Sequence, residues 1–156
     1  MDVRWAVSGG HTRGSRTAAR GILAGMSQEN VEIVKRALEA FSSGDAGSFT
    51  SLTTPDVEWK TGLGAIEGGE IFHGHEGVER YFARLSGAWE EFRFLPHEFR
   101  DHDDVVLVLG RLEGRGRSGG VPVDSPVGAV WDLREGKIWR LRAYLDHEEA
   151  TRVAGL

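Results

Sequence analysis

The order of the periodic segments constrains the fold of this chain more than any single motif does. An amphipathic stretch over residues 27–41 spaces its apolar side chains by three, four and three positions, as one face of a helix requires: Val31, Val34, Leu38 and Phe41. A second helical stripe covers about residues 75–89 and contains Val78, Phe82, Leu85 and Trp89. Strand-like runs fill most of the chain beyond it. Helices followed by consecutive antiparallel strands predict the α+β class.

The strands are predicted from alternating or continuous apolar runs that lie between turn residues. They cover residues 56–61, 92–100, 105–115, 121–133 and 138–145. Because proline cannot donate to a sheet ladder, Pro96 predicts a bulge or an interruption within its strand. The glycine-rich stretch at residues 62–72 is predicted to be an irregular loop at the rim of a pocket.

Polar residues and glycines mark where the helices begin and end. Ser27 is a suitable N-cap for the first helix, and Gly44 supplies its stop. A further short helix is expected around Phe49. Asp146, with Glu149 three positions later, predicts the start of a short C-terminal helix.

Composition excludes several classes of protein. The 156 residues are 40% apolar and 28% charged, which suits a single globular domain. No apolar run approaches the roughly 20 residues that span a bilayer, so we expect no membrane segment. The net charge of −5 disfavours binding to a phosphate backbone, so nucleic acid is not an expected partner. The chain has no cysteine, so disulfides and thiolate chemistry are excluded, which fits the expected cytoplasmic location. Its preference for arginine over lysine is typical of a GC-rich bacterial genome.

The first 25 residues differ from the rest of the chain. They hold four arginines and one aspartate, whereas residues 26–156 carry a net charge of −8. Three interpretations remain open for this segment: a translation start placed too early, a disordered tail, or a functional basic arm. Met26 begins a segment that looks like a natural start. We therefore treat residues 1–25 as an N-terminal extension and residues 26–156 as the domain.

Several short motifs occur in an order that resembles a known superfamily. They are the Gly44-Asp45 turn, the Val57-Glu58-Trp59 strand, the helix start at Gly74-His-Glu-Gly-Val78, and Gly136-Lys-Ile138 before the last strand. This order resembles the nuclear transport factor 2-like superfamily, and most closely its SnoaL-like branch. The resemblance implies a cystatin-like cone, in which a curved antiparallel sheet wraps around the N-terminal helices and encloses a pocket. It also implies a small hydrophobic or aromatic ligand, a homodimer and no cofactor.

Ketosteroid isomerase, a relative in this superfamily, uses an aspartate base and a polar oxyanion hole. When its turns are aligned with those of this chain, its polar positions fall on apolar residues: Ala37, Trp59, Phe82 and Ala129. The carboxylate used by SnoaL-like cyclases falls near Ala143. Apolar groups cannot replace hydrogen-bond donors in an oxyanion site, so we do not expect steroid isomerase chemistry.

Strand alternation indicates which side chains line the pocket. The residues expected there are aromatic or aliphatic and suit a flat hydrophobic ligand: Trp59, Phe82, Trp131, Trp139, Leu141 and Leu145. Arg140, Arg142 and Tyr144 alternate with them on the last strand. The resemblance makes these three residues candidates for a dimer interface.

Three polar residues are candidates for catalysis. Arg111 and Glu113 share the parity of Leu107 and Leu109, so they enter the pocket if those leucines do. Alternatively, the inward face of the strand switches after Gly110 and leaves both charges in water. His73 is placed at the pocket rim as a general acid or base. We expect no metal site, because the His73-Gly-His75 pair lacks a third ligand at a suitable spacing.

Two functions from different classes follow from these observations. The first is a cofactor-free enzyme of the cyclase, isomerase, hydratase or hydrolase type, in which His73 or Glu113 transfers a proton and Arg111 polarises the substrate. The second is a non-catalytic ligand-binding or dimerisation domain. The position of Arg111 and Glu113 relative to the pocket distinguishes them.

Overall fold

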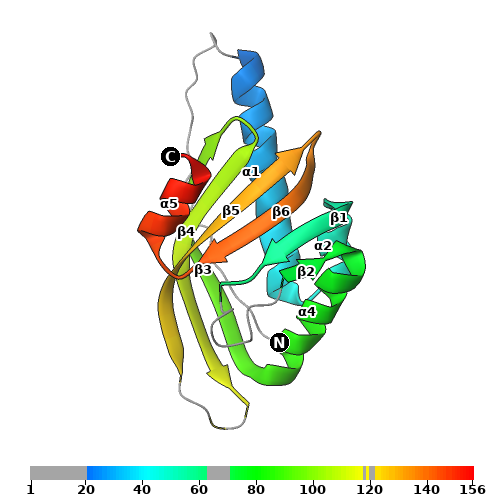
Figure 1. Ribbon diagram of the computed structural model, residues 1–156, viewed down its shortest axis with the longest axis vertical. Helices are drawn as coiled ribbons and strands as arrows, with labels where there is room; N and C mark the ends of the chain where they lie inside the picture. The colour runs from blue at the N-terminus through cyan, green and yellow to red at the C-terminus, as the bar shows by residue number, and fades with distance from the viewer. Residues whose placement is uncertain (1–20, 63–70, 118, 120–121) are drawn as a thin grey trace.

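The computed structural model describes residues 21–62, 71–117, 119 and 122–156 (Figure 1). The expected N-terminal extension therefore lies mostly outside the described residues. The helices are α1 (Gly21–Ser43), α2 (Ala46–Thr50), α4 (Gly74–Ala88) and α5 (His147–Ala154). The strands are β1 (Thr53–Lys60), β2 (Ile71–His73), β3 (Trp89–His102), β4 (Val105–Gly116), β5 (Val123–Arg134) and β6 (Lys137–Tyr144).

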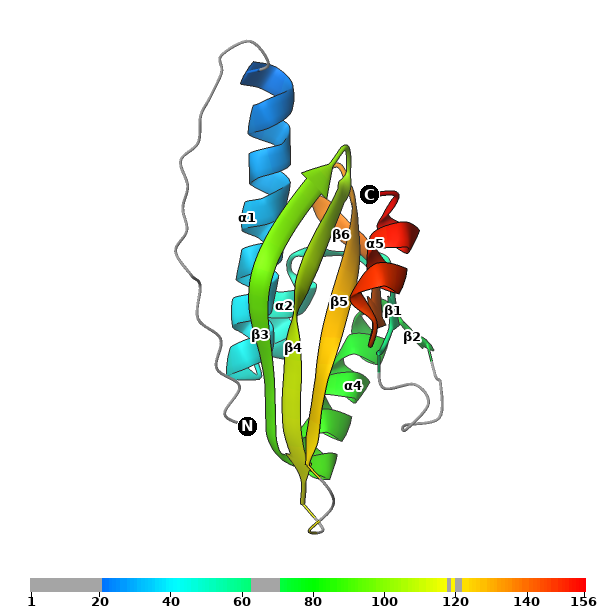
Figure 2. The ribbon, with the colours of Figure 1, turned by 90° about the vertical axis from the view of Figure 1, so that its left-hand side faces the viewer.

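The strands form one curved, unclosed sheet in the order β2-β1-β6-β5-β4-β3. The neighbouring strands pair antiparallel, except for β1 and β6, which are parallel. The helices α1, α2 and α4 pack against the face that we call the inner face, and α5 packs against the outer face. Figure 2 shows α1 and α5 on opposite sides of the sheet. The expected α+β class and the sheet wrapped around the N-terminal helices are confirmed.

The first helix is longer than expected but ends where the sequence predicts. It begins at Gly21, six residues before Ser27. At its end Gly44 has a φ of +72°, a conformation that glycine adopts without steric cost. The Gly44 N–H donates to the Phe41 carbonyl at 3.1 Å, and the Asp45 N–H donates to the Ala40 carbonyl at 2.9 Å. This pair of hydrogen bonds is a Schellman motif, which satisfies the last carbonyls of the helix.

Strand β4 is buried on both faces. Val106, Val108 and Leu112 belong to the main core on the inner face. Leu107 and Leu109 alternate with them and pack beneath α5 on the outer face. A strand covered on both sides reads as a continuous apolar run, so its sequence cannot indicate which side chains face which way.

The sheet contains one strand that the sequence did not predict and one irregularity that it did. Strand β2 falls at the end of the expected loop at 62–72 and is too short to show alternation. The bulge near Pro96 is confirmed, because the pairing of β3 with β4 shifts register between Pro96 and Glu98. Opposite it, Gly110 lies so close to the Leu95 carbonyl that a Cβ atom would collide with it.

None of the described helices is both long enough and apolar enough to cross a membrane.

Close packing of α5 against β5 depends on Gly128. A Cβ atom at this position would collide with the Cβ atom of Ala150 and lie 3.2 Å from Leu109 Cδ2. We expect Gly128→Ala to push α5 away from the sheet and to lower the free energy of unfolding by about 1–3 kcal/mol, measured by urea denaturation. Gly87→Ala is the matched control, because a Cβ atom there meets nothing within 4 Å. In an exposed helix this change should raise stability by up to about 1 kcal/mol. Equal stability of the two variants would contradict the packing described here.

Candidate functional site

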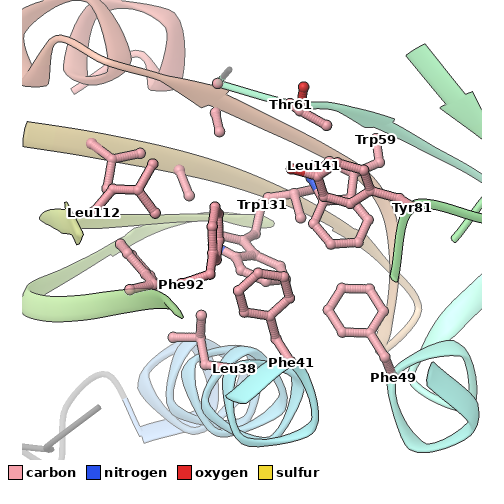
Figure 3. Close-up of a pocket in the computed structure, with 15 residues that line it drawn as sticks. Leu38, Phe41, Phe49, Trp59, Thr61, Tyr81, Phe92, Leu112, Trp131 and Leu141 are labelled. Carbon is pink, nitrogen blue, oxygen red and sulfur yellow. The ribbon is translucent and has the colours of Figure 1, made fainter. Parts of the chain in front are cut away.

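An apolar cavity of about 70 Å³ lies between the inner face of the sheet and the helices (Figure 3). Every strand except β2 contributes to its wall, together with α1, α2 and α4. The lining residues are mostly aromatic or aliphatic: Leu38, Phe41, Phe49, Trp59, Thr61, Gly62, Tyr81, Phe92, Phe94, Leu112, Val127, Ala129, Trp131, Leu141 and Ala143. Such a wall matches the usual character of a small-molecule site.

Ring contacts fix the aromatic part of this wall. Phe49 from α2 stacks on Trp59 from β1, with ring centroids 5.0 Å apart and planes 9° from parallel. Tyr81 from α4 meets Trp59 edge to face at 4.9 Å. Phe41 from α1 meets Phe92 from β3 edge to face at 5.9 Å. Each contact joins a helix to the sheet, so the same packing that closes the domain also holds the cavity wall in place.

Asp45 holds Phe49 against the wall by capping α2. Its Oδ1 accepts a hydrogen bond from the Ser48 backbone N–H at 3.1 Å, and its Oδ2 accepts one from Ser48 Oγ at 2.7 Å. These hydrogen bonds favour the ionised carboxylate and lower the pKa of Asp45 below its ordinary value of 3.8. The cap therefore stabilises α2 most when Asp45 is charged.

Four lining residues bring hydrogen-bonding side-chain groups to the otherwise apolar wall. Thr61 and Tyr81 carry hydroxyl groups, and Trp59 and Trp131 each carry an indole N–H. Trp131 is only 2% exposed. Its Nε1 atom is buried and has no hydrogen-bond partner among the described residues. An indole N–H only donates a hydrogen bond, so Trp131 is suited to an oxygen or nitrogen acceptor on a ligand.

The structure places Trp59, Trp131 and Leu141 on the cavity wall, where the sequence expected them. Phe82 lies behind the wall, where its ring contacts Phe41, Phe49 and Trp59 at centroid distances of 5.8, 5.5 and 6.2 Å. Leu145 is not among the lining residues but lies beside them. Its Cδ2 atom is 3.4 Å from the point where a Cβ atom would stand on Gly62, which does line the cavity.

Trp139 lies outside the cavity, contrary to expectation. The pairing of β5 with β6 passes from Asp132↔Arg140 to Leu133↔Ile138 and leaves Trp139 as an extra residue. This bulge breaks the alternation on which the expectation was based. The Trp139 ring lies instead between the guanidinium groups of Arg134 and Arg140, each 4.5 Å from its centroid.

Arg111 and Glu113 also lie outside the cavity. They do share the parity of Leu107 and Leu109, but those leucines face α5 and not the cavity. Arg111 and Glu113 therefore both lie on the outer face of the sheet. There Arg111 Nε donates to Asp124 Oδ1 at 3.1 Å, and Glu113 Oε1 accepts a hydrogen bond from Arg93 Nη2 at 2.8 Å.

His73 points away from the cavity as well. It is exposed, whereas its neighbour Phe72 is buried in the main core and pairs with Trp59. Within the part of the chain that the structure describes, no three His, Cys, Asp or Glu side chains gather in a way that would hold a metal ion. The three residues expected to catalyse a reaction are thus separate from the cavity.

The candidate interface residues lie on the outer face of β6. Arg140 Nε and Arg142 Nη2 donate to the same Asp132 oxygen, Oδ2, at 3.0 and 2.9 Å. The Lys60 ammonium lies 4.5 Å from the centre of the Tyr144 ring. All three residues therefore make polar contacts within their own chain.

The sequence-based prediction omitted several residues that line the cavity, although the periodicity of the sequence indicates some of them. Phe41 ends the apolar stripe of the first helix, and Phe92 and Phe94 share one parity on β3. Tyr81 and Phe82 are both buried, so the helical stripe alone could not indicate which of them reaches the cavity.

The cap on α2 predicts a specific dependence of stability on pH. Folding lowers the pKa of Asp45, so the charged carboxylate stabilises the folded state. This stabilisation is fully present above the ordinary pKa of 3.8 and is lost as the pH falls through the folded-state pKa. We expect Asp45→Ala to lower the urea midpoint at pH 7, and the gap to the unsubstituted protein to narrow as the pH falls below 3.8. Ser48→Ala should produce a smaller loss, because it removes the hydroxyl donor but keeps the backbone N–H. A gap that stays constant down to pH 2 would contradict this role.

Comparisons with known proteins agree with this architecture. Residues 34–141 match the family model of the SnoaL-like domain. A nuclear transport factor 2-like protein of unknown function from Burkholderia pseudomallei has 24% sequence identity and a TM-score of 0.68, with 82% of this chain and 98% of that chain covered. TerC, crystallised with polyporic acid, has 25% identity and a TM-score of 0.67, with 82% and 99% covered.

A protein from Catenulispora acidiphila with a ketosteroid isomerase-like fold, in complex with trimethylamine, has 18% identity and a TM-score of 0.65, with 80% and 93% covered. The comparison with functionally curated proteins found no match. Because the matching family model spans more than half of the sequence, this chain belongs to the SnoaL-like domain family.

Proposed function

We propose that this protein binds a small apolar or aromatic molecule in the cavity on the inner face of the sheet. The observation that carries the proposal is the wall itself, in which Phe49, Trp59 and Trp131 form one contiguous group of rings beside aliphatic side chains. Flat faces of this kind favour a flat ligand, and the hydrogen-bonding groups among them would orient it.

The relatives support the same class of function. TerC was crystallised with polyporic acid, and the Catenulispora protein was solved with trimethylamine. Both are organic molecules held by proteins of this fold. We extend to the present chain only the general role, the binding of a small organic molecule.

The size of the cavity limits its ligand. Its volume of about 70 Å³ is less than half of the roughly 150 Å³ of an engineered apolar cavity that binds benzene. A ligand with one or two rings therefore either moves the wall outward or extends through the open side of the cavity. We expect such compounds to bind better than larger, four-ring compounds such as steroids.

The groups on the wall favour binding over acid–base catalysis. The polar side-chain groups of the wall are the hydroxyls of Thr61 and Tyr81 and the two indoles of Trp59 and Trp131. Proton transfer near pH 7 is most often carried out by histidine or a carboxylate. The sequence-based candidates for that role, His73, Arg111 and Glu113, lie on other surfaces. We therefore favour a ligand-binding protein over a cofactor-free cyclase, isomerase or hydratase.

A variant that fills the cavity tests the proposal. Ala129 lines the cavity, and Ala129→Leu adds an isopropyl group inside it. The panel consists of toluene, indane, naphthalene, 1-indanone and a steroid, measured by isothermal titration calorimetry. We expect saturable binding of at least one aromatic compound with one or two rings, weakened more than tenfold in A129L because the added group occupies the ligand's space.

Glu113→Gln is the control for that experiment, because Glu113 lies on the outer face and pairs with Arg93. It should leave the affinity unchanged. Circular dichroism checks that both variants are folded. If no compound binds saturably, or if A129L binds as well as the unsubstituted protein, the cavity is not a ligand site. If a bound compound is instead converted to product, and alanine at His73, Arg111 or Glu113 abolishes the conversion, our preference for binding over catalysis is wrong.

A further inference from the structure

We propose that the indole N–H of Trp131 is the anchor of this cavity, and that the ligand is an uncharged aromatic compound that carries a hydrogen-bond acceptor such as a ketone oxygen. This inference rests on the proposed function, because it specifies the ligand class of the same cavity. Three features of the described residues support it: the buried state of the N–H, the absence of charge on the described wall, and the packing that holds the indole in place.

The Trp131 N–H has an unmet requirement for a partner. It is buried in a wall made largely of hydrocarbon, and no described residue accepts a hydrogen bond from it. Burial of a donor without an acceptor has a free-energy cost, because the donor has lost its hydrogen bond to water. Of the buried side-chain atoms that lack a partner among the described residues, Trp131 Nε1 is the one that belongs to a residue lining the cavity. A ligand that supplies an acceptor there would recover this cost on binding.

The rest of the wall indicates that the acceptor is uncharged. The described lining residues carry no formal charge. An ionised ligand would lose its hydration and find no opposite charge in the described wall, which is strongly unfavourable in an apolar site. A ketone, quinone or ether oxygen accepts a hydrogen bond at a much smaller desolvation cost.

Packing holds the donor in place before a ligand arrives. Trp131 lies toward the C-terminal end of β5, between two neighbouring strands, and is paired with Val106 on one side and with Leu141 on the other. Its ring lies 6.2 Å from that of Phe49, which itself stacks on Trp59. Little side-chain freedom remains to be lost on binding, so the hydrogen bond should discriminate well between ligands with and without an acceptor.

A pair of ligands matched in shape tests the donor. Indane and 1-indanone share a bicyclic skeleton, and only the ketone has an acceptor. Their dissociation constants are measured for the unsubstituted protein and for a form in which Trp131 is replaced by 3-benzothienylalanine, which keeps the ring shape and lacks the N–H. One net hydrogen bond corresponds to roughly fivefold in affinity. We expect the preference for 1-indanone over indane to fall about fivefold on this replacement.

A second measurement reports on the hydrogen bond directly. The carbonyl stretch of bound 1-indanone should appear at a lower infrared frequency in the unsubstituted protein than in the benzothienylalanine form. Trp139→Phe is the control variant, because Trp139 packs between two arginines outside the cavity. It should change neither the preference nor the carbonyl frequency.

The outcomes separate this inference from the proposed function. If both ligands bind and the preference is the same with and without the N–H, Trp131 is not the anchor, although the cavity remains a ligand site. If neither ligand nor any other compound of the panel binds, the proposed function fails and the inference fails with it. A lower preference together with a higher carbonyl frequency on replacement supports the anchor.

Discussion

The alternation of side chains along β5 is the constraint on which the rest of the structure depends. Val127, Ala129 and Trp131 face the cavity, while Gly128 and Val130 face α5. A slip of one residue would send the indole of Trp131 toward α5 and place a glycine in the cavity wall. Both layers of the protein therefore fix the same register, and the cavity is positioned by the packing of a helix on the opposite face of the sheet.

The unpartnered N–H of Trp131 is a cost that the fold carries, about 1–3 kcal/mol for a buried donor without an acceptor. This is a sizeable part of the 5–15 kcal/mol that stabilise a typical domain. A ligand with an acceptor would offset this cost, so binding of such a ligand should raise the free energy of unfolding.

Periodicity predicted the elements of this fold well, and it predicted the facing of side chains on several of them. The stripe that ends at Phe41 and the alternation around Trp59 and Trp131 lead to the cavity wall. On β4 the parity that Arg111 and Glu113 share with Leu107 and Leu109 could not indicate which face of the sheet they take, because both faces of β4 are apolar where α5 covers the sheet.

The apolar residues in and behind the cavity wall are consistent with one another as a set. The resemblance to ketosteroid isomerase places polar groups where this chain has Ala37, Trp59, Phe82 and Ala129, all of which are buried. A polar group restored at one of these positions would be buried among rings without partners, because such groups are stable in a core only as a connected network. What remains is a wall of rings with a donor at a different position, Trp131, which can hold a ligand's acceptor but does not exchange a proton with it near pH 7.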